Sequence, residues 1–415
     1  MIVSIDRELR KCSKCGKCRN VCPVFLEAKS EGMVARGRIS LAEAFAAGEI
    51  QDTAKLRQYL WGCLKCLRCA DACPSGVKFD KIISEMRRRV GARAALPWMA
   101  RLSMHLVSTR RWLFNLLVRA AALGQKLLPR HKEGKVRHLP LVLFDGRGMP
   151  EIAPKSVLSS FAGYYGPADA ERKVALFVGC LINYAYPEVA EAMVKVLNHF
   201  RIGVLIPKRQ VCCGTPALSL GDEELALRLA RVNAEAFRGL GVDAIICGCA
   251  SGGATLKGEY PELLAAQRPL GAPVMDFSEF VAPLAEGIGA GFDATVAWHD
   301  PCHLKYVQKI SKEPREILSR VAEFEDFEGA DYCCGMGGVF SAFFPELSMK
   351  IAARKVDAIE KAAPEVLATG CAGCMLQLRD RLAAKASSVR VMHIAEVIAA
   401  ALEDDPARER AAGRR

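Results

Sequence analysis

The stretch CSKCGKCRNVCP at residues 12–23 recurs as CLKCLRCADACP at residues 63–74. Each copy has the spacing Cys-x2-Cys-x2-Cys-x3-Cys and carries a proline directly after the fourth cysteine. Three closely spaced thiolates can wrap three irons of one cluster, while the fourth, beyond a short turn, reaches the neighbouring cluster. The repeat therefore predicts two [4Fe-4S] clusters in an α-helical, ferredoxin-like domain at the N-terminal end.

The same spacing assigns ligands to each cluster. The first set is Cys12, Cys15, Cys18 and Cys73, and the second set is Cys63, Cys66, Cys69 and Cys22. Zinc is the alternative, because it also binds Cys-x2-Cys pairs. Two identical blocks of four cysteines, each closed by proline, favour iron–sulfur clusters. The segments 38–49 and 53–64 between the blocks have a helical pattern, so we expect a mostly α domain over residues 1–95.

A second repeat indicates a duplicated α/β architecture. Apolar strand-like segments end in cysteine at KVALFVGC (173–180) and TVAWHDPC (295–302), and a Cys-Cys-Gly sequence follows each about thirty residues later. Amphipathic helical patterns at 187–200, 223–240 and 345–362 alternate with apolar strands, which is typical of short parallel sheets. We expect two CCG domains, the first over 171–290 and the second over 291–402.

Both CCG domains place cysteines after strands, where α/β folds position their sites. A disulfide within an adjacent Cys-Cys pair would be strained, but a polynuclear cluster can bind both thiolates because its irons are spread over several ångströms. The set predicted in the second domain is Cys302, Cys333, Cys334, Cys371 and Cys374, and that in the first is Cys180, Cys212, Cys213 and Cys249. Buried structural thiols are the alternative.

The first CCG domain departs from the pattern of the second. Gly252 stands where the spacing of Cys371 and Cys374 would place a cysteine, and Cys247 lies nearby. Cys247 is either a substitute ligand or an ordinary strand residue. The sequence thus predicts one or two further iron–sulfur clusters in addition to the two [4Fe-4S] clusters.

The composition agrees with a multidomain metal-binding protein. The chain has 415 residues, 51% of them hydrophobic, and 18 cysteines. Its first residues lack the apolar stretch of a secretory signal, which argues for metal ligands rather than disulfides and leads us to expect a cytoplasmic location. No apolar run approaches the roughly 18 residues that cross a bilayer.

Charge is distributed unevenly along the chain. Residues 1–140 contain 28 Lys+Arg against 11 Asp+Glu, a net +17, whereas the remainder contains 30 against 35, a net −5. A basic region suggests an acidic partner, an anionic membrane surface or nucleic acid, but a solvated face that offsets anionic clusters is the preferred interpretation. No nucleic-acid-binding motif accompanies the charge, so we expect no nucleic acid as a partner.

Residues 96–170 are expected to contain amphipathic helices followed by a linker. The basic amphipathic pattern over 96–130 places Trp98, Leu102, Leu106, Leu113, Leu117 and Leu127 near one face. We expect it to pack on the CCG domains, with peripheral contact at the inner face of a membrane as the alternative. The polar segment 403–415 is expected to be a disordered tail.

Taken together, these motifs resemble the iron–sulfur subunit of glycolate oxidase and its relatives, over nearly the whole chain. The resemblance rests on ARGRISL (35–41), CPSGV (73–77), CASGGATLKGEYPELL (249–264), HDPCHLKYVQKISKEPREIL (299–318) and ATGCAGCMLQL (368–378). Related CCG domains occur in the catalytic subunit of heterodisulfide reductase, in lactate-utilisation iron–sulfur proteins and in anaerobic glycerol-3-phosphate dehydrogenase subunits.

The resemblance implies an electron-transfer subunit that accepts electrons from an FAD-linked 2-hydroxyacid dehydrogenase subunit of glycolate or lactate type. The electrons would pass toward a quinone or another acceptor. The chain has no GxGxxG sequence opening a helix after a strand, so we expect the flavin on a partner chain. The complete cysteine set of the second CCG domain resembles heterodisulfide reductase more closely, which keeps reduction of a disulfide or quinone as the alternative function.

Three polar residues flank Cys302 within HDPCH, namely His299, Asp300 and His303. One interpretation is that they tune a cluster or carry protons. The preferred interpretation is that they form hydrogen bonds that shape the loop at the end of the strand. No catalytic residue is assigned from the sequence.

Overall fold

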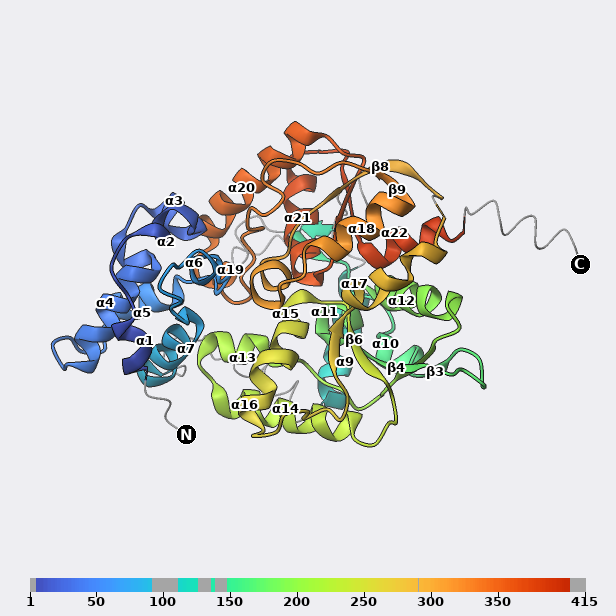
Figure 1. Ribbon diagram of the computed structural model, residues 1–415, viewed down its shortest axis with the longest axis horizontal. Helices are drawn as coiled ribbons and strands as arrows, with labels where there is room; N and C mark the ends of the chain where they lie inside the picture. The colour runs from blue at the N-terminus through green and yellow to red at the C-terminus, as the bar shows by residue number, and fades with distance from the viewer. Residues whose placement is uncertain (1–4, 92–110, 126–135, 139–147, 290, 404–415) are drawn as a thin grey trace, which may run out of the picture.

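The computed structural model describes residues 5–91, 111–125, 136–138, 148–289 and 291–403. Helices from the N-terminal region form a lobe at one side of the molecule, drawn in blue in Figure 1. Two α/β units lie beside this lobe, the first coloured green to yellow and the second orange to red. The expected tail at 404–415 and the amphipathic pattern at 96–110 and 126–130 lie outside the described residues.

The N-terminal lobe is built from short helices around a compact core. They are α1 (Asp6–Arg10), α2 (Lys17–Val21), α3 (Pro23–Ala28), the 3-10 turn η1 (Glu31–Met33), α4 (Ala35–Ala46), α5 (Ala54–Trp61), α6 (Arg68–Asp71) and α7 (Phe79–Val90). The Thr53 side chain accepts a hydrogen bond from the Leu56 N–H at 3.2 Å and so caps α5. Ile39, Leu60 and Ile82 from α4, α5 and α7 are buried together in the core of the lobe.

The first α/β unit contains a five-stranded sheet with the order β3-β5-β4-β6-β7. Its strands are β3 (Gly163–Tyr165), β4 (Lys173–Phe177), β5 (Gly203–Ile206), β6 (Ala244–Cys247) and β7 (Val274–Asp276). All neighbours are parallel except β3, which pairs antiparallel with β5. Its helices are α10 (Val157–Ser160), α11 (Gly179–Tyr184), α12 (Pro187–His199), α13 (Thr215–Leu220), α14 (Glu223–Phe237), α15 (Ala250–Ala254), the π-helical η5 (Thr255–Glu259), α16 (Tyr260–Leu263), α17 (Phe277–Val281) and the 3-10 helix η6 (Ala282–Gly287).

The second unit repeats this topology with a four-stranded, fully parallel sheet of order β11-β10-β8-β9. Its strands are β8 (Phe292–Trp298), β9 (Ala322–Phe324), β10 (Val366–Thr369) and β11 (Arg390–His393). Its helices are the π-helical η7 (His303–Gln308), α18 (Lys312–Val321), α19 (Phe340–Phe343), α20 (Pro345–Ala362), α21 (Ala372–Ala384) and α22 (Ile394–Ala401). The order β5-β4-β6-β7 matches β9-β8-β10-β11, so the expected duplicated α/β fold with short parallel sheets is confirmed.

The two units share one apolar core rather than lying apart on a linker. Buried residues of both sheets, such as Ile246 and Val296, belong to the same continuous cluster. Helix α12 packs on α22, and the Lys195 ammonium donates a hydrogen bond to the Ala399 carbonyl at 2.8 Å. The shared core fixes the position of one unit's strand ends relative to the other's.

Helix α9 (Arg111–Gly124) packs on the first unit through its aromatic and polar side chains. The Phe114 ring meets Tyr184 edge-on at 5.5 Å, and the Tyr184 hydroxyl donates to Asn115 Oδ1 at 2.6 Å. This is the packing expected for the region, but the expected position of Leu117 on the packed face is wrong, since Leu117 is 51% exposed. Leu117 points away because Phe114 and Ala122 provide the buried side of the helix.

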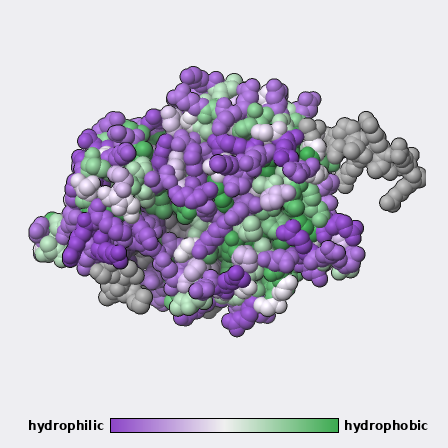
Figure 2. Space-filling view, viewed as in Figure 1, coloured by the Kyte–Doolittle hydropathy of each residue, from purple (hydrophilic) through white to green (hydrophobic). Residues whose placement is uncertain are grey.

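The surface and the helices bear on the membrane alternative. Figure 2 shows a mostly hydrophilic surface over the N-terminal lobe and more apolar colouring right of the centre of the face in view, where the two α/β units meet. Among the described residues, no helix is both long enough and apolar enough to cross a bilayer.

A short antiparallel pair of strands, β1 (Val136–His138) and β2 (Gly148–Pro150), lies between the lobe and the first unit along the chain.

Candidate iron–sulfur sites

The eight cysteines of the N-terminal lobe line two neighbouring cavities. One cavity is bordered by Cys12, Cys15, Cys18 and Cys73, and the next by Cys22, Cys63 and Cys66. Cys69 borders both cavities. The structure therefore groups these thiols as the spacing of the motif suggests, with the fourth cysteine of each block placed in the cavity of the other block. Ligation of iron by these thiols stays a prediction.

In each of the two loops that carry these thiols, two residues have a left-handed backbone conformation, which is unfavourable for residues other than glycine. Lys14 and Gly16 of the first block have φ of 57° and 84°, and the matching Lys65 and Leu67 of the second have 53° and 58°. A residue with a Cβ pays roughly 1–2 kcal/mol in the left-handed region. Such strain persists where the surroundings determine the conformation, and a cluster held by three thiolates of one loop would supply that constraint.

Backbone N–H groups of one of these loops and of the first turn of α3 also donate hydrogen bonds to cysteine sulfur. The Lys65 N–H donates to Cys63 Sγ at 3.4 Å, and the Phe25 N–H donates to Cys22 Sγ at 3.5 Å. Hydrogen bonds to sulfur stabilise thiolate charge and tune the potential of a bound cluster. The loop geometry and the donor pattern both fit the [4Fe-4S] clusters that the sequence predicts.

The second CCG domain brings all five of its predicted cysteines together. Cys302 precedes η7, Cys333 and Cys334 lie in the loop before α19, and Cys371 and Cys374 begin α21. Cys302 hydrogen bonds to Cys333, and Cys334 Sγ lies 3.4 Å from Cys374 Sγ. The five side chains come from the ends of β8 and β10 and from one intervening loop, as a site at the carboxyl edge of a parallel sheet requires.

The electrostatics of this group favour the thiolate at two positions, Cys334 and Cys371, whereas hydrogen bonding to neighbouring cysteines and burial raise the pKa of Cys302, Cys333 and Cys374 well above the usual value. Hydrogen bonds from the Cys333 and Cys374 thiols lower the pKa of Cys334 to about 5. Hydrogen bonds from Cys249 and then Cys374 lower the pKa of Cys371 well below its usual value. Cys371 is also the N-cap of the 13-residue helix α21, whose positive dipole end favours negative charge. The thiolate is the form of cysteine that binds metal.

His299 tests whether a metal group fits at this site. Its side chain is 1% exposed, and neither ring nitrogen has a hydrogen-bond partner among the described residues. One ring nitrogen and the sulfurs of Cys334 and Cys374 all lie within 4.8 Å of one another. Burial lowers the pKa of His299 to about 3, so the imidazole is neutral. A buried polar side chain without a partner is rare, and a cluster bound beside His299 would supply the missing partner.

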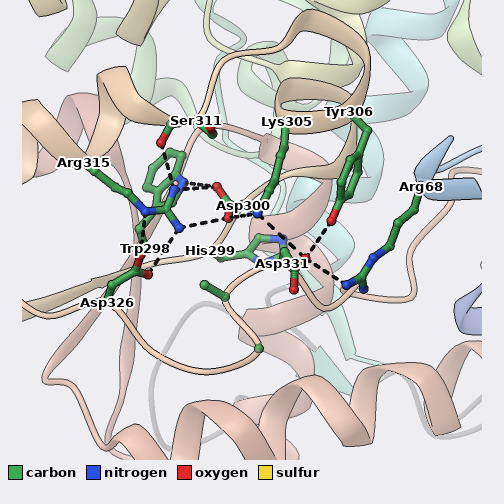
Figure 3. Close-up of polar contacts among 12 residues, drawn as sticks. Arg68, Trp298, His299, Asp300, Lys305, Tyr306, Ser311, Arg315, Asp326 and Asp331 are labelled. Carbon is green, nitrogen blue, oxygen red and sulfur yellow. Dashed lines mark hydrogen bonds and ion pairs between the residues drawn. The ribbon is translucent and has the colours of Figure 1, made fainter. Parts of the chain in front are cut away.

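Asp300 and His303, in contrast, form the hydrogen bonds expected of them. Asp300 accepts from Arg315 at 2.8 and 2.9 Å, from Lys305 at 3.1 Å and from the Trp298 indole at 2.9 Å, as Figure 3 shows. Burial opposes its charge, but the hydrogen bonds from Arg315 hold the pKa of Asp300 below its usual range. The network anchors the end of β8 directly before Cys302.

The same network continues to the N-terminal lobe. Asp331 accepts from the Tyr306 hydroxyl at 2.7 Å and from Arg68 at 2.9 Å, and Figure 3 shows these side chains converging on it. Arg68 belongs to α6, within the second cysteine block. The ion pair therefore joins the loop that carries Cys66 and Cys69 to the second CCG domain.

The first CCG domain assembles three of its predicted cysteines closely. Cys212 hydrogen bonds to both Cys180 and Cys213, and Cys213 Sγ lies 3.1 Å from the Thr215 hydroxyl. The hydrogen bond from Cys212 lowers the pKa of Cys213 to about 7. The pKa of Cys334, the second cysteine of the other Cys-Cys pair, is lowered in the same way. Cys180 and Cys212 also border an apolar cavity of about 240 Å³, which Phe114, Tyr184 and Leu229 help to line.

Cys249, the fourth predicted cysteine, lies at the junction of the two CCG domains. It is the N-cap of α15 with φ −138° and ψ 112°, nearly identical to Cys371 with φ −144° and ψ 114°. Cys249 Sγ lies 4.0 Å from Cys371 Sγ. The Ala250 N–H donates to the Gly370 carbonyl at 3.0 Å, so the two cysteine loops are in direct backbone contact.

The His303 imidazole contacts both other parts of the chain, the first CCG domain and the N-terminal lobe. His303 of the second CCG domain contacts Ser251 Oγ of the first at 3.0 Å through Nδ1, and the Lys65 carbonyl of the N-terminal lobe at 2.9 Å through Nε2. Cys22 and Cys66 of the lobe and Cys333 of the second CCG domain all pack against one small apolar cluster, which contains Leu64 and Phe340. The cysteine groups thus form a continuous line from the lobe into the second and then the first CCG domain.

Two buried residues near the sites have no signal in the sequence. Lys355 on α20 is fully buried and donates to the Gly329 and Ala330 carbonyls at 2.8 and 2.9 Å. Burial lowers its pKa to about 7. His393 reaches across to the Gly248 carbonyl at 2.8 Å and supports the loop before Cys249. Only tertiary packing reveals that these two side chains lie close to cysteine loops.

Comparisons with known proteins match every one of these regions. The family described as 4Fe-4S dicluster domain matches residues 8–77, and the family described as cysteine-rich domain matches residues 174–257 and 296–379. The chain is 30% identical to the probable glycolate oxidase iron–sulfur subunit of Bacillus subtilis, over 95% of this chain and 94% of that one. It is 27% identical to the glycolate oxidase iron–sulfur subunit of Escherichia coli, over 96% of both chains. It is 29% identical to a subunit of the fumarate reductase (CoM/CoB) of Methanothermobacter marburgensis, over 96% of this chain and 73% of that one.

Proposed function

This chain belongs to the family of glycolate oxidase iron–sulfur subunits, and from that premise we propose its place in electron flow. It is an iron–sulfur electron-transfer subunit of an oxidoreductase. It accepts electrons from a separate FAD-linked 2-hydroxyacid dehydrogenase subunit of glycolate or lactate type and passes them toward a quinone or another acceptor. Peripheral contact at the inner face of a membrane is part of the same proposal.

The continuous line of cysteine groups is the observation that carries this proposal. Cys69 borders both cavities of the lobe, Cys66 and Cys333 pack against the same apolar cluster, and Cys371 Sγ lies 4.0 Å from Cys249 Sγ. Iron–sulfur clusters, when bound at such sites, supply one-electron chemistry without proton transfer. The protein's own part is to space the sites, to shield them from water and to stabilise their negative charge.

We propose two [4Fe-4S] clusters in the lobe and a further cluster in the second CCG domain. The lobe ligands are Cys12, Cys15, Cys18 and Cys73 for one cluster, and Cys63, Cys66, Cys69 and Cys22 for the other. The ligands in the second CCG domain are Cys302, Cys333, Cys334, Cys371 and Cys374. The positive charge needed near these anionic sites comes from the basic N-terminal region and from buried side chains such as Arg87, whose guanidinium donates to the Cys63 carbonyl at 2.7 Å.

Reduction of a disulfide or quinone at a CCG-domain cluster is the second candidate function. The assembly of all five cysteines in the second domain and the 240 Å³ apolar cavity beside Cys180 and Cys212 favour it. In this case the chain would both relay electrons and bind the acceptor. The two candidates differ in where the acceptor is reduced, not in the direction of electron flow.

The test begins with iron, zinc and acid-labile sulfide analysis of anaerobically purified protein. The chain is then mixed with an FAD-linked glycolate or lactate dehydrogenase subunit and the hydroxyacid, and cluster reduction is followed by freeze-quench EPR. We expect iron rather than zinc, and reduction that requires both the flavin subunit and the hydroxyacid. Zinc in place of iron, or clusters that stay oxidised with every such donor, would overturn the proposal.

A single variant tests whether the acceptor is reduced at the cluster of the second CCG domain. Cys334→Ser removes the central thiol of the second CCG group and leaves the lobe cysteines in place. If the acceptor is reduced at this cluster, disulfide or quinone reduction stops while the lobe clusters are still reduced by the donor. Undiminished disulfide or quinone reduction in Cys334→Ser would exclude reduction of the acceptor at the cluster of the second CCG domain.

A further inference from the structure

The position of Gly252 in the first CCG domain corresponds in three dimensions to that of Cys374 in the second. Gly252 follows Cys249 at the start of α15 as Cys374 follows Cys371 at the start of α21, and the two N-caps share one backbone conformation. A Cβ placed on Gly252 would lie 3.9 Å from Cys213 Sγ, just as Cys374 Sγ lies 3.4 Å from Cys334 Sγ. A side chain at 252 would therefore enter the group of thiols formed around Cys213.

The thiol of Cys247 fills the space that this missing side chain leaves. Its Sγ lies 3.3 Å from the Cβ that residue 252 would have, closer than the Cys249 and Cys213 side chains. Cys247 is the last residue of β6 and is 1% exposed. It packs with Cys213 on one face of the first sheet, in an apolar cluster that includes Cys212 and Cys249 as partly buried members. The sulfur reaches the group from the strand instead of from the helix.

The second CCG domain shows what occupies this strand position when the helix supplies a cysteine. Cys247 pairs in register with Asp276 of β7, and Thr369 pairs in the same way with His393 of β11. Thr369, at the end of β10, is buried, and its hydroxyl lies 3.4 Å from the His299 carbonyl. One domain thus has threonine on the strand and cysteine on the helix, and the other has cysteine on the strand and glycine on the helix.

We propose that Cys247 is the relocated fifth ligand of an iron–sulfur cluster in the first CCG domain, together with Cys180, Cys212, Cys213 and Cys249. This inference rests on the proposed function, because it assumes that the cysteine groups hold clusters. It assigns all 18 cysteines of the chain to four groups of thiols. It also places the last cluster of the line beside the 240 Å³ apolar cavity that Cys180 and Cys212 border.

The exchange of ligand between strand and helix can be tested by reversing it. Iron per chain and the EPR spectrum of the reduced protein are measured for Cys247→Ala, for Cys213→Ser and for the double variant Cys247→Ala/Gly252→Cys. We expect Cys247→Ala to lose the same iron and the same EPR signal as Cys213→Ser. The double variant should regain both the iron and the EPR signal. A cysteine at 252 has the backbone geometry of Cys374, and its thiol enters the space that the Cys247 thiol occupied.

Thr369→Ala is the matched control, since it truncates the equivalent strand residue of the second CCG domain. We expect it to keep the wild-type iron content. Should Cys247→Ala not accumulate as folded protein, Cys247→Ser is nearly the same size and tests the same ligand. Retained EPR signals from the lobe clusters report that each variant is folded.

The failure of this inference is distinguishable from the failure of the proposed function. Wild-type iron in Cys247→Ala, while Cys213→Ser loses a cluster, would overturn the role of Cys247 alone. Wild-type iron in both variants would overturn the cluster in the first CCG domain and leave the electron relay through the other sites intact. Absence of iron from the wild-type lobe would instead overturn the proposed function.

Discussion

The glycines of the two Cys-Cys-Gly sequences allow one prediction to be worked through in detail. Gly214 and Gly335 both have left-handed backbones, with φ of 89° and 85°. They differ in their surroundings. A Cβ on Gly335 would lie 2.5 Å from the Ser348 carbonyl oxygen of α20, whereas the nearest atom to a Cβ on Gly214 is the Ala226 Cα at 3.7 Å. The pair therefore separates backbone strain from steric overlap at equivalent sites.

Gly214→Ala should cost roughly 1–2 kcal/mol in free energy of unfolding, because alanine pays for the left-handed conformation and meets no close neighbour. Gly335→Ala should cost a further 1–3 kcal/mol or so, the usual penalty for overpacking, because the Ser348 carbonyl belongs to a helix backbone and cannot rotate away. The overlap also pushes the loop of Cys333 and Cys334 outward. We therefore expect Gly335→Ala to lower the iron content as well.

Anaerobic urea unfolding followed by circular dichroism measures the difference, with iron analysis on the same samples. The comparison between variants matters more than either absolute value, because a multidomain metalloprotein need not unfold in two states. Equal destabilisation by the two substitutions would refute the argument from the Ser348 contact. Destabilisation of less than about 0.5 kcal/mol at both sites would refute the requirement for a left-handed glycine.

Three further predictions concern charge, pH and metal. Arg87→Met should destabilise the chain by about 3 kcal/mol or more in urea unfolding, since the buried guanidinium satisfies the carbonyls of Leu60, Cys63 and Ser219, which would lose their donor. Burial lowers the pKa of His393 from 6.5 to about 4, so the unfolded chain binds more protons in this range; stability should fall by up to about 3 kcal/mol as pH drops from 6.5 to 4, and thermal unfolding of His393→Gln should show a smaller fall. Iron removal by an anaerobic chelator should lower the unfolding temperature, because clusters bind the folded state, and an unchanged melting curve would contradict this.

Much of the fold can be predicted because its signals are local. Apolar segments that end in cysteine, and helical patterns such as 187–200 and 345–362, indicate strands and helices without any knowledge of their neighbours. Helices α12 and α20 lie at these positions, and both sheets are short and, apart from the antiparallel edge strand β3, parallel as expected. The duplication is visible in the sequence because each half repeats the same order of strand, cysteine and helix.

The parts that cannot be predicted depend on contacts between distant segments. The spacing of cysteines places Cys249 in the first CCG group, but only packing of the two units brings it within 4.0 Å of Cys371. The preferred interpretation of His299 as a hydrogen-bonding residue does not hold among the described residues, because its ring faces thiols instead of polar partners. The expectation for Leu117 fails because a helical pattern cannot tell which apolar side chains face the protein and which stay exposed.

The contact between Cys249 and Cys371 has a consequence for how the protein stores charge. The charges concerned are those of two centres, one bound by each cysteine group, whose middles would lie farther apart than the two sulfurs. Two unit charges about 10 Å apart in a medium of effective dielectric constant 20 repel by about 1.7 kcal/mol. If both CCG domains hold clusters, as we propose, an electron held by one domain would make the next electron harder to add to the other. The two halves would titrate as one unit, with stepwise midpoint potentials that belong to neither half alone. Gene duplication would in this way have placed two similar centres so close together that their reduction is anticooperative.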